Sequence, residues 1–185
     1  MWLGLVAILG VALVLPFSDL GTFIRRAGDP KLKLELAGTL LTGIFATIAA
    51  FELSLPDRSL GWALFPAPSF ILWLGSSGYS CWRHWLVSGP NGWHIGESGA
   101  CFLWIVAFGI PLAVSLFVLL RRSHPIAPGP VAAMAGLGVA SLAAFLLQFF
   151  HPFDVTFIDL GLHLAGVATV IIMARAVARP GLNAL

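Results

Sequence analysis

Long runs of apolar residues fill almost the whole chain, and they constrain its fold more than any other feature. Each run is ended by charged residues or by clusters of Pro and Gly. A helix needs about 20 apolar residues to cross the hydrocarbon core of a bilayer. The predicted fold class is therefore all-α, a polytopic integral membrane bundle that forms one domain over residues 1–185. The six transmembrane helices are expected at about residues 2–20, 34–53, 60–80, 98–120, 131–150 and 155–177.

The composition excludes most other classes of protein. Of the 185 residues, 59% are hydrophobic and 10% are charged, whereas soluble domains have about 45–50% and about 25%. The net charge of +2 is too small to attract a nucleic acid. The sequence contains no Walker loop, dinucleotide fingerprint, HExxH or GxSxG motif. We therefore expect no enzyme activity, no direct contact with nucleic acid and no soluble substrate.

The basic residues do not determine how the spans are oriented. An even number of spans places both chain ends on one side of the membrane. With that side in the cytoplasm, the inner loops and ends carry Arg58, Arg121, Arg122, Arg175 and Arg179. The outer loops then carry Arg25, Arg26, Lys31, Lys33 and Arg83. The two sides carry the same number of Lys and Arg residues, so the positive-inside rule does not favour either orientation.

Ionisable residues gather around the start of the sixth expected span. His151 and Asp154 lie in the turn before this span, and Asp159 and His163 are four residues apart within it. Residues with this spacing share one face of a helix, and charged groups at mid-bilayer cost at least ~2.5–3.5 kcal/mol. One interpretation is that Asp159 and His163 satisfy each other inside the bundle while His151 and Asp154 cap the helix. The other is a metal or proton site, because imidazole and carboxylate bind Zn²⁺ and similar ions.

Other polar and aromatic residues are interpreted as features of the membrane surface. Lys31, Lys33 and Glu35 at the start of the second span are expected to snorkel, and Glu52 is expected at the membrane edge. An interfacial belt and packing are the expected roles of Trp82, Trp85, Trp93 and Trp104.

Prolines, small residues and cysteines add three expectations about packing. Pro66 and Pro68 should kink the third span, and the Ala- and Gly-rich first half of the fifth span suits close helix packing. Cys81 and Cys101 flank the longest polar connection. A disulfide between them would make sense on an extracytoplasmic side; the alternative is two unrelated thiols.

Several short motifs resemble the NrsF-type membrane anti-sigma factors. They include Cys101-Phe-Leu-Trp-Ile105 with Pro111, Leu119-Leu-Arg-Arg122, Ala133-Met-Ala-Gly-Leu-Gly-Val-Ala140 and the His151-Pro152-x-Asp154 turn. This resemblance implies a six-span protein of the bacterial inner membrane that negatively regulates an extracytoplasmic-function sigma factor. Its partners would be that sigma factor and the lipid bilayer, and both termini would lie in the cytoplasm. Release of the sigma factor would follow periplasmic or membrane stress.

The resemblance also implies a signal-sensing site on the periplasmic face. Of two cysteines implicated in sensing in the best-known members, one matches Cys101 and the other falls at His151. A thiol and an imidazole cannot form a disulfide, but both are good ligands for a soft metal. We expect a thiophilic divalent metal held mainly by Cys101 and His151, with Asp154 and Cys81 close by. A function of another class, a small transporter or ion-conducting protein using Asp159 and His163, is the alternative.

Overall fold

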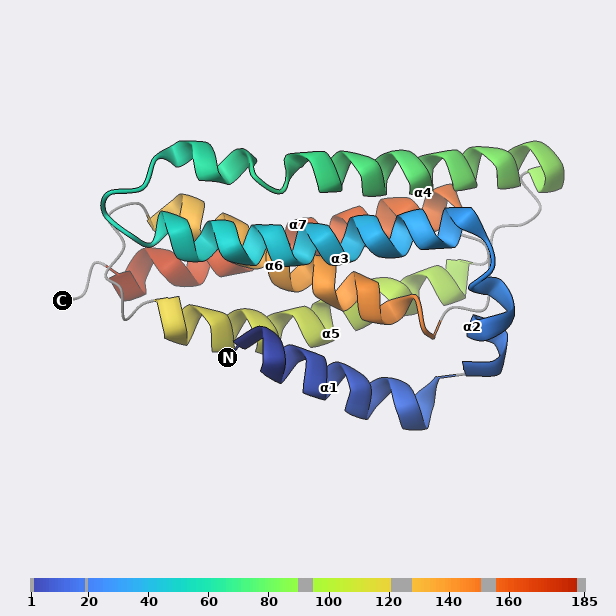
Figure 1. Cartoon of the computed structure of the whole chain (residues 1–185), viewed down its shortest axis with the longest axis horizontal. Helices are drawn as coiled ribbons and strands as arrows, with labels where there is room; N and C mark the ends of the chain where they lie inside the picture. Colours follow the sequence, from blue (N-terminus) through green and yellow to red (C-terminus); the bar gives the residue numbers. More distant parts are fainter. Residues whose placement is uncertain (1, 19, 90–94, 121–127, 151–155, 183–185) are drawn as a thin grey trace.

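A computed structural model describes residues 2–18, 20–89, 95–120, 128–150 and 156–182 of the chain (Figure 1). All secondary structure within these ranges is helical, so the all-α prediction is confirmed. The elements are α1 (Trp2–Phe17), α2 (Leu20–Arg26), α3 (Pro30–Leu53), the 3₁₀ helix η1 (Leu60–Leu64), α4 (Ala67–Ser88), α5 (Ile95–Leu120), α6 (Pro128–Leu147) and α7 (Phe157–Leu182).

The long helices lie side by side as an elongated bundle (Figure 1). Helix α6 occupies its centre, because it packs against α3, α5 and α7. Helix α4 packs on α3 and contacts α7 near its end, and α1 lies at the opposite edge. Successive long helices run in alternating directions, so that α3, α5 and α7 run parallel to one another (Figure 1).

Four helical segments are long and apolar enough to cross a membrane. They are Pro30–Leu53, Cys101–Leu120, Pro128–Leu147 and Phe157–Ala176. Helix α1 is apolar but has 16 residues, fewer than the about 20 that a span requires. Helix α4 has 22 residues but includes Arg83, His84 and several serines. Helix length and composition therefore support four of the six expected spans directly.

The third expected span is divided instead of kinked. The 3₁₀ helix η1 ends at Leu64, and α4 begins at Ala67 with Pro66 as its N-cap. Proline is tolerated in the first turn because its missing N–H group would have no partner there. Helix α4 then continues to Ser88, well past the expected end at residue 80. Residues 82–88 are therefore helical, not part of a polar connection.

Glycines allow α6 to approach its neighbours closely. A Cβ atom added at Gly138 would lie 2.7 Å from Thr47 Oγ1 of α3. A Cβ atom added at Gly136 would lie 2.8 Å from the Cα of Ile171 in α7. Small residues at helix crossings are typical of membrane bundles, where tight van der Waals packing drives association. The predicted close packing of this segment is confirmed.

The tryptophans occupy two kinds of environment. Trp82 and Trp85 lie exposed on α4 with their ring centroids 5.6 Å apart, as expected for an interfacial belt. Trp104 of α5 packs between Phe108 and Phe150, with centroid distances of 4.2 and 4.6 Å. Trp93 lies outside the described residues.

Helix α1 is attached to the bundle through a few specific contacts. Trp2 Nε1 donates a hydrogen bond to Ser115 Oγ of α5, at 3.0 Å. Beyond the other end of α1, Phe23 of α2 packs on Phe149, which follows α6, with the ring centroids 4.5 Å apart. Helix α1 is therefore held near both of its ends.

Candidate functional site

Buried polar side chains gather at the end of the bundle where α3 and α7 begin and α4 finishes. Glu35 of α3 is 4% exposed, Cys81 of α4 is 1% exposed and His163 of α7 is 6% exposed. A polar or ionisable group inside a membrane bundle is costly and marks a functional site by default. We refer to these three residues and their hydrogen-bond partners as the polar cluster.

Glu35 belongs to the interior of the bundle, so its expected role as a snorkelling residue is wrong. Its Oε1 accepts a hydrogen bond from Ser80 Oγ of α4, at 2.7 Å. Lys33, by contrast, is exposed as expected. Thr39 and Thr42 are buried on the same α3 face as Glu35, one and two turns further on. This spacing of small residues at i+4 and i+7 is the sequence signal that could have placed Glu35 inside.

Cys81 connects α4 to the start of α7. Its thiol donates a hydrogen bond to the backbone carbonyl of Thr156, at 3.2 Å. The carboxylates of Glu35 and Asp159 lie close enough to act electrostatically on the same thiol. Three helices therefore place acidic groups and a thiol around one point.

Thr156 and Asp159 cap the N-terminus of α7 reciprocally. The backbone N–H of Thr156 donates to Asp159 Oδ2 at 2.8 Å, and the Thr156 hydroxyl donates to the same oxygen at 2.7 Å. The backbone N–H of Asp159 donates to Thr156 Oγ1 at 3.2 Å. This is the geometry of a capping box, with Asp in place of the usual Glu at the third helical position. The pattern Thr156-x-x-Asp159 in the sequence could have predicted it.

His163 lies one turn beyond Asp159 on the same face of α7. Its Nδ1 donates to the backbone carbonyl of Asp159, at 2.7 Å. The bond therefore joins the imidazole to the main chain, while the Asp159 carboxylate serves the helix end. These contacts stabilise the start of α7, and the alternative of a proton or ion relay stays a prediction.

Cys101 of α5 lies at the same level of the bundle as His163. A Cβ atom at Gly166 would lie 3.2 Å from Ile105 Cγ2, and one at Gly109 would lie 2.9 Å from Val170 Cγ2. In both contacts, the α5 residue and the α7 residue are separated by the same number of positions in the sequence, as expected for two parallel helices packed side by side. Cys101 precedes Ile105 by one turn, so it lies beside the turn of α7 that holds His163.

Both cysteines are buried, and they are not joined in a disulfide. Of the residues expected to sense the signal and bind a metal, Cys101 is described, whereas His151 and Asp154 lie outside the described residues. In the described part of the chain, no group of three or more His, Cys, Asp and Glu side chains is arranged to hold a metal ion. The metal site with Cys101 and His151 as ligands stays a prediction.

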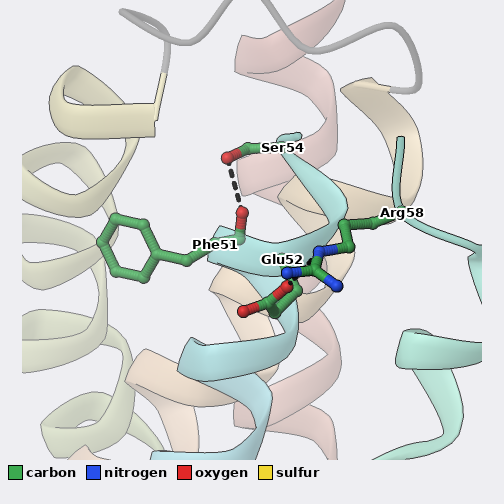
Figure 2. Close-up of polar contacts among 4 residues, drawn as sticks. All are labelled: Phe51, Glu52, Ser54 and Arg58. Atoms are coloured by element: carbon green, nitrogen blue, oxygen red, sulfur yellow. Dashed lines mark hydrogen bonds and ion pairs between the residues drawn. The ribbon is translucent and has the colours of Figure 1, made fainter. Parts of the chain in front are cut away.

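A separate ion pair marks the opposite end of the bundle (Figure 2). Arg58 Nε lies 2.8 Å from Glu52 Oε2, and both side chains are partly exposed. Ser54 at the C-cap of α3 donates its hydroxyl to the carbonyl of Phe51, at 2.6 Å. Glu52 therefore lies at a bundle end, in agreement with its expected place at the membrane edge.

Comparison with known proteins adds one finding to this geometry. The family described as "Negative regulator of sigma F" (NrsF) matches the chain over residues 1–183. No curated protein and no solved structure matches it.

Proposed function

The chain belongs to the NrsF family of negative regulators of sigma F, and we propose that it sequesters an extracytoplasmic-function sigma factor at the bacterial inner membrane. The family match over residues 1–183 is the observation that carries this proposal. It confirms the resemblance found in the short sequence motifs. A sigma factor is accordingly its partner, and we propose a regulatory role without a catalytic reaction.

The proposed topology has six spans, with both chain ends in the cytoplasm. Helix α1 and the η1–α4 segment supply the two crossings that length and composition alone do not support. The alternating directions of successive long helices, with α1 beginning and α7 ending toward the same end of the bundle, favour this arrangement (Figure 1). The Glu52–Arg58 pair then faces the cytoplasm, and the polar cluster around Glu35 and Cys81 faces the periplasm.

The polar cluster lies where a periplasmic signal would act. We propose Cys101, His151 and Asp154 as the sensing residues, with a thiophilic divalent metal as one form of the signal. His151 and Asp154 precede Thr156 by five and two residues in the sequence, and the Thr156 carbonyl accepts the hydrogen bond of the Cys81 thiol. Cys81 therefore contacts the segment next to these residues.

Helix α7 offers a route from the sensing end to the end that would hold the sigma factor. The Cys81–Thr156 hydrogen bond and the Thr156–Asp159 capping box position its first turn. If a metal held by Cys101 and His151 also took Cys81 as a thiolate ligand, the Cys81 proton would pass to water and the bond to α7 would be lost. A bundle with two arrangements, one of which binds the sigma factor, would convert this local change into release.

Deletion and complementation test the proposed function. In a deletion strain, transcripts from the promoters of the partner sigma factor should rise without stress, and the wild-type gene should restore repression. Unchanged transcript levels in the deletion strain would refute the anti-sigma function.

The sensing residues are tested separately, in the complemented strain. Cys101→Ser and His151→Ala should keep repression and membrane insertion but weaken induction by a thiophilic metal. His124→Ala is the matched control, because His124 lies in the loop expected on the cytoplasmic side. Full induction in the Cys101→Ser/His151→Ala double variant would refute the sensing site and leave the anti-sigma function intact.

A further inference from the structure

An apolar cavity of about 400 Å³ lies between α1, α3 and α6. Its walls include Val6, Ala7 and Gly10 of α1, Leu40 and Ile44 of α3, and Phe145 of α6. The volume falls within the range of small-molecule binding sites. On α1 the space lies at Ala7, whose methyl group is too short to fill it, whereas Gly10 packs closely against Leu146.

The lining of the cavity suits a hydrocarbon chain. Its lining residues are all apolar, and two of its three walls, α3 and α6, are segments that can cross a membrane. A cavity without polar groups cannot hold ordered water, and an empty one would forfeit dispersion contacts along its lining. Within a bilayer, the apolar chains of the surrounding lipids are the molecules available to fill it.

A positive charge lies at the position that a lipid headgroup would take. Lys33 is exposed on α3, and it precedes Leu40 by seven residues. Residues seven apart share one helix face and are separated by about 10 Å along the axis. Lys33 therefore belongs to the same face of α3 as Leu40, about 10 Å nearer the start of the helix and thus toward α2 (Figure 1). An ammonium group at this depth complements a lipid phosphate.

We propose that this cavity binds one acyl chain of a phospholipid whose phosphate pairs with Lys33. The size of the cavity favours an acyl chain over a partner helix. A helix with its side chains is about 10 Å wide, so a single turn would already take up about 400 Å³. An extended hydrocarbon chain is thinner and enters between α1 and its neighbours lengthwise. The proposal requires membrane insertion of the chain but no sigma factor.

Photo-crosslinking in membranes tests the acyl-chain site. The full-length protein is reconstituted in vesicles that contain a phospholipid with a diazirine on its acyl chain, and the labelled peptides are identified by mass spectrometry. Wild-type protein should be labelled on the α1 and α6 residues that line the cavity. Ala7→Phe fills the cavity and should lower this labelling about tenfold, because displacing even two buried methylenes has an effect of that size.

Ala12→Phe is the matched control for this substitution. Ala12 is exposed on α1 and is not part of the lining, so the variant should be labelled like the wild type. Equal labelling of Ala7→Phe and Ala12→Phe would overturn the proposal. Crosslinks between two copies of the chain at the lining residues would also overturn it, because a second protomer would then be the occupant.

The headgroup contact has its own control pair. Lys33→Gln should reduce the phospholipid that remains bound after extraction in mild detergent, measured by native mass spectrometry. Lys31→Gln should not, because the Lys31 ammonium lies 6.0 Å from the Tyr79 ring centroid and thus faces α4. Equal retention by the two variants would refute the role of Lys33. Since neither assay contains a sigma factor, their outcome is independent of the anti-sigma function.

Discussion

The crossing of α3 and α4 depends on the absence of a side chain at Gly38. A Cβ atom added there would lie 2.9 Å from the N, Cα and Cβ atoms of Trp73. Two of these atoms are backbone, so no side-chain rotation can relieve the overlap. The substitution Gly38→Ala should therefore force the two helices apart where Trp73 is buried.

The expected change in stability follows from two opposing effects. Overpacking of a well-packed interior costs about 1–3 kcal/mol. Replacing Gly by Ala inside a helix contributes about 0.8–1 kcal/mol of stabilisation. Gly75→Ala on α4 is the matched control, because a Cβ atom there meets nothing within 4 Å. Gly75→Ala gains the helix stabilisation of alanine but has no steric overlap. The free energies of unfolding of the two variants should therefore differ by about 1–3 kcal/mol.

The assay is equilibrium unfolding of the full-length protein in mixed micelles, followed by circular dichroism. Gly38→Ala should unfold at a lower denaturant concentration than Gly75→Ala. The reasoning fails if both variants have the same free energy of unfolding, because α3 and α4 would then have room for a methyl group between them. It also fails if Gly38→Ala is the more stable variant.

Two further predictions concern the helix cap and the topology. Thr156→Ala removes the side-chain half of the capping box and should lower the free energy of unfolding by about 1 kcal/mol. Thr169→Ala removes a hydroxyl that donates to the Ala165 carbonyl within the same helix; it should cost less in the same assay, and equal costs would refute the capping role. Reporters placed at Arg122 and after Leu185 should both indicate the cytoplasm, and a periplasmic signal from either would overturn the proposed topology.

The main helices could be predicted from the sequence because polar and proline residues interrupt the apolar runs. The predicted ends at Leu53 and Leu120 agree with the ends of α3 and α5. The prediction was wrong around Pro66, where proline starts a helix instead of bending one. It also missed the extension of α4 through Arg83, because a charged residue at a membrane surface can continue a helix as readily as end it.

The polar cluster was only partly predictable. The shared face of Asp159 and His163 follows from their spacing, and the capping role of Thr156 was present as a local pattern that went unrecognised. The contact of Cys81 with the Thr156 carbonyl joins residues that are far apart in the sequence. It depends on how α4 packs against α7, and no local pattern encodes that arrangement.

The length of α1 has a consequence for the lipid around the protein. Its 16 residues extend about 24 Å, whereas the hydrocarbon core of a bilayer is about 30 Å thick. The Trp2–Ser115 bond attaches the first residue of α1 to α5, and the Phe23–Phe149 contact attaches α2, the helix that follows. In the six-span arrangement that we propose, the surrounding bilayer would become thinner beside α1, at a cost of fractions of a kcal/mol per Å of hydrophobic mismatch. This edge of the bundle would favour thin membrane regions and lipids with short chains.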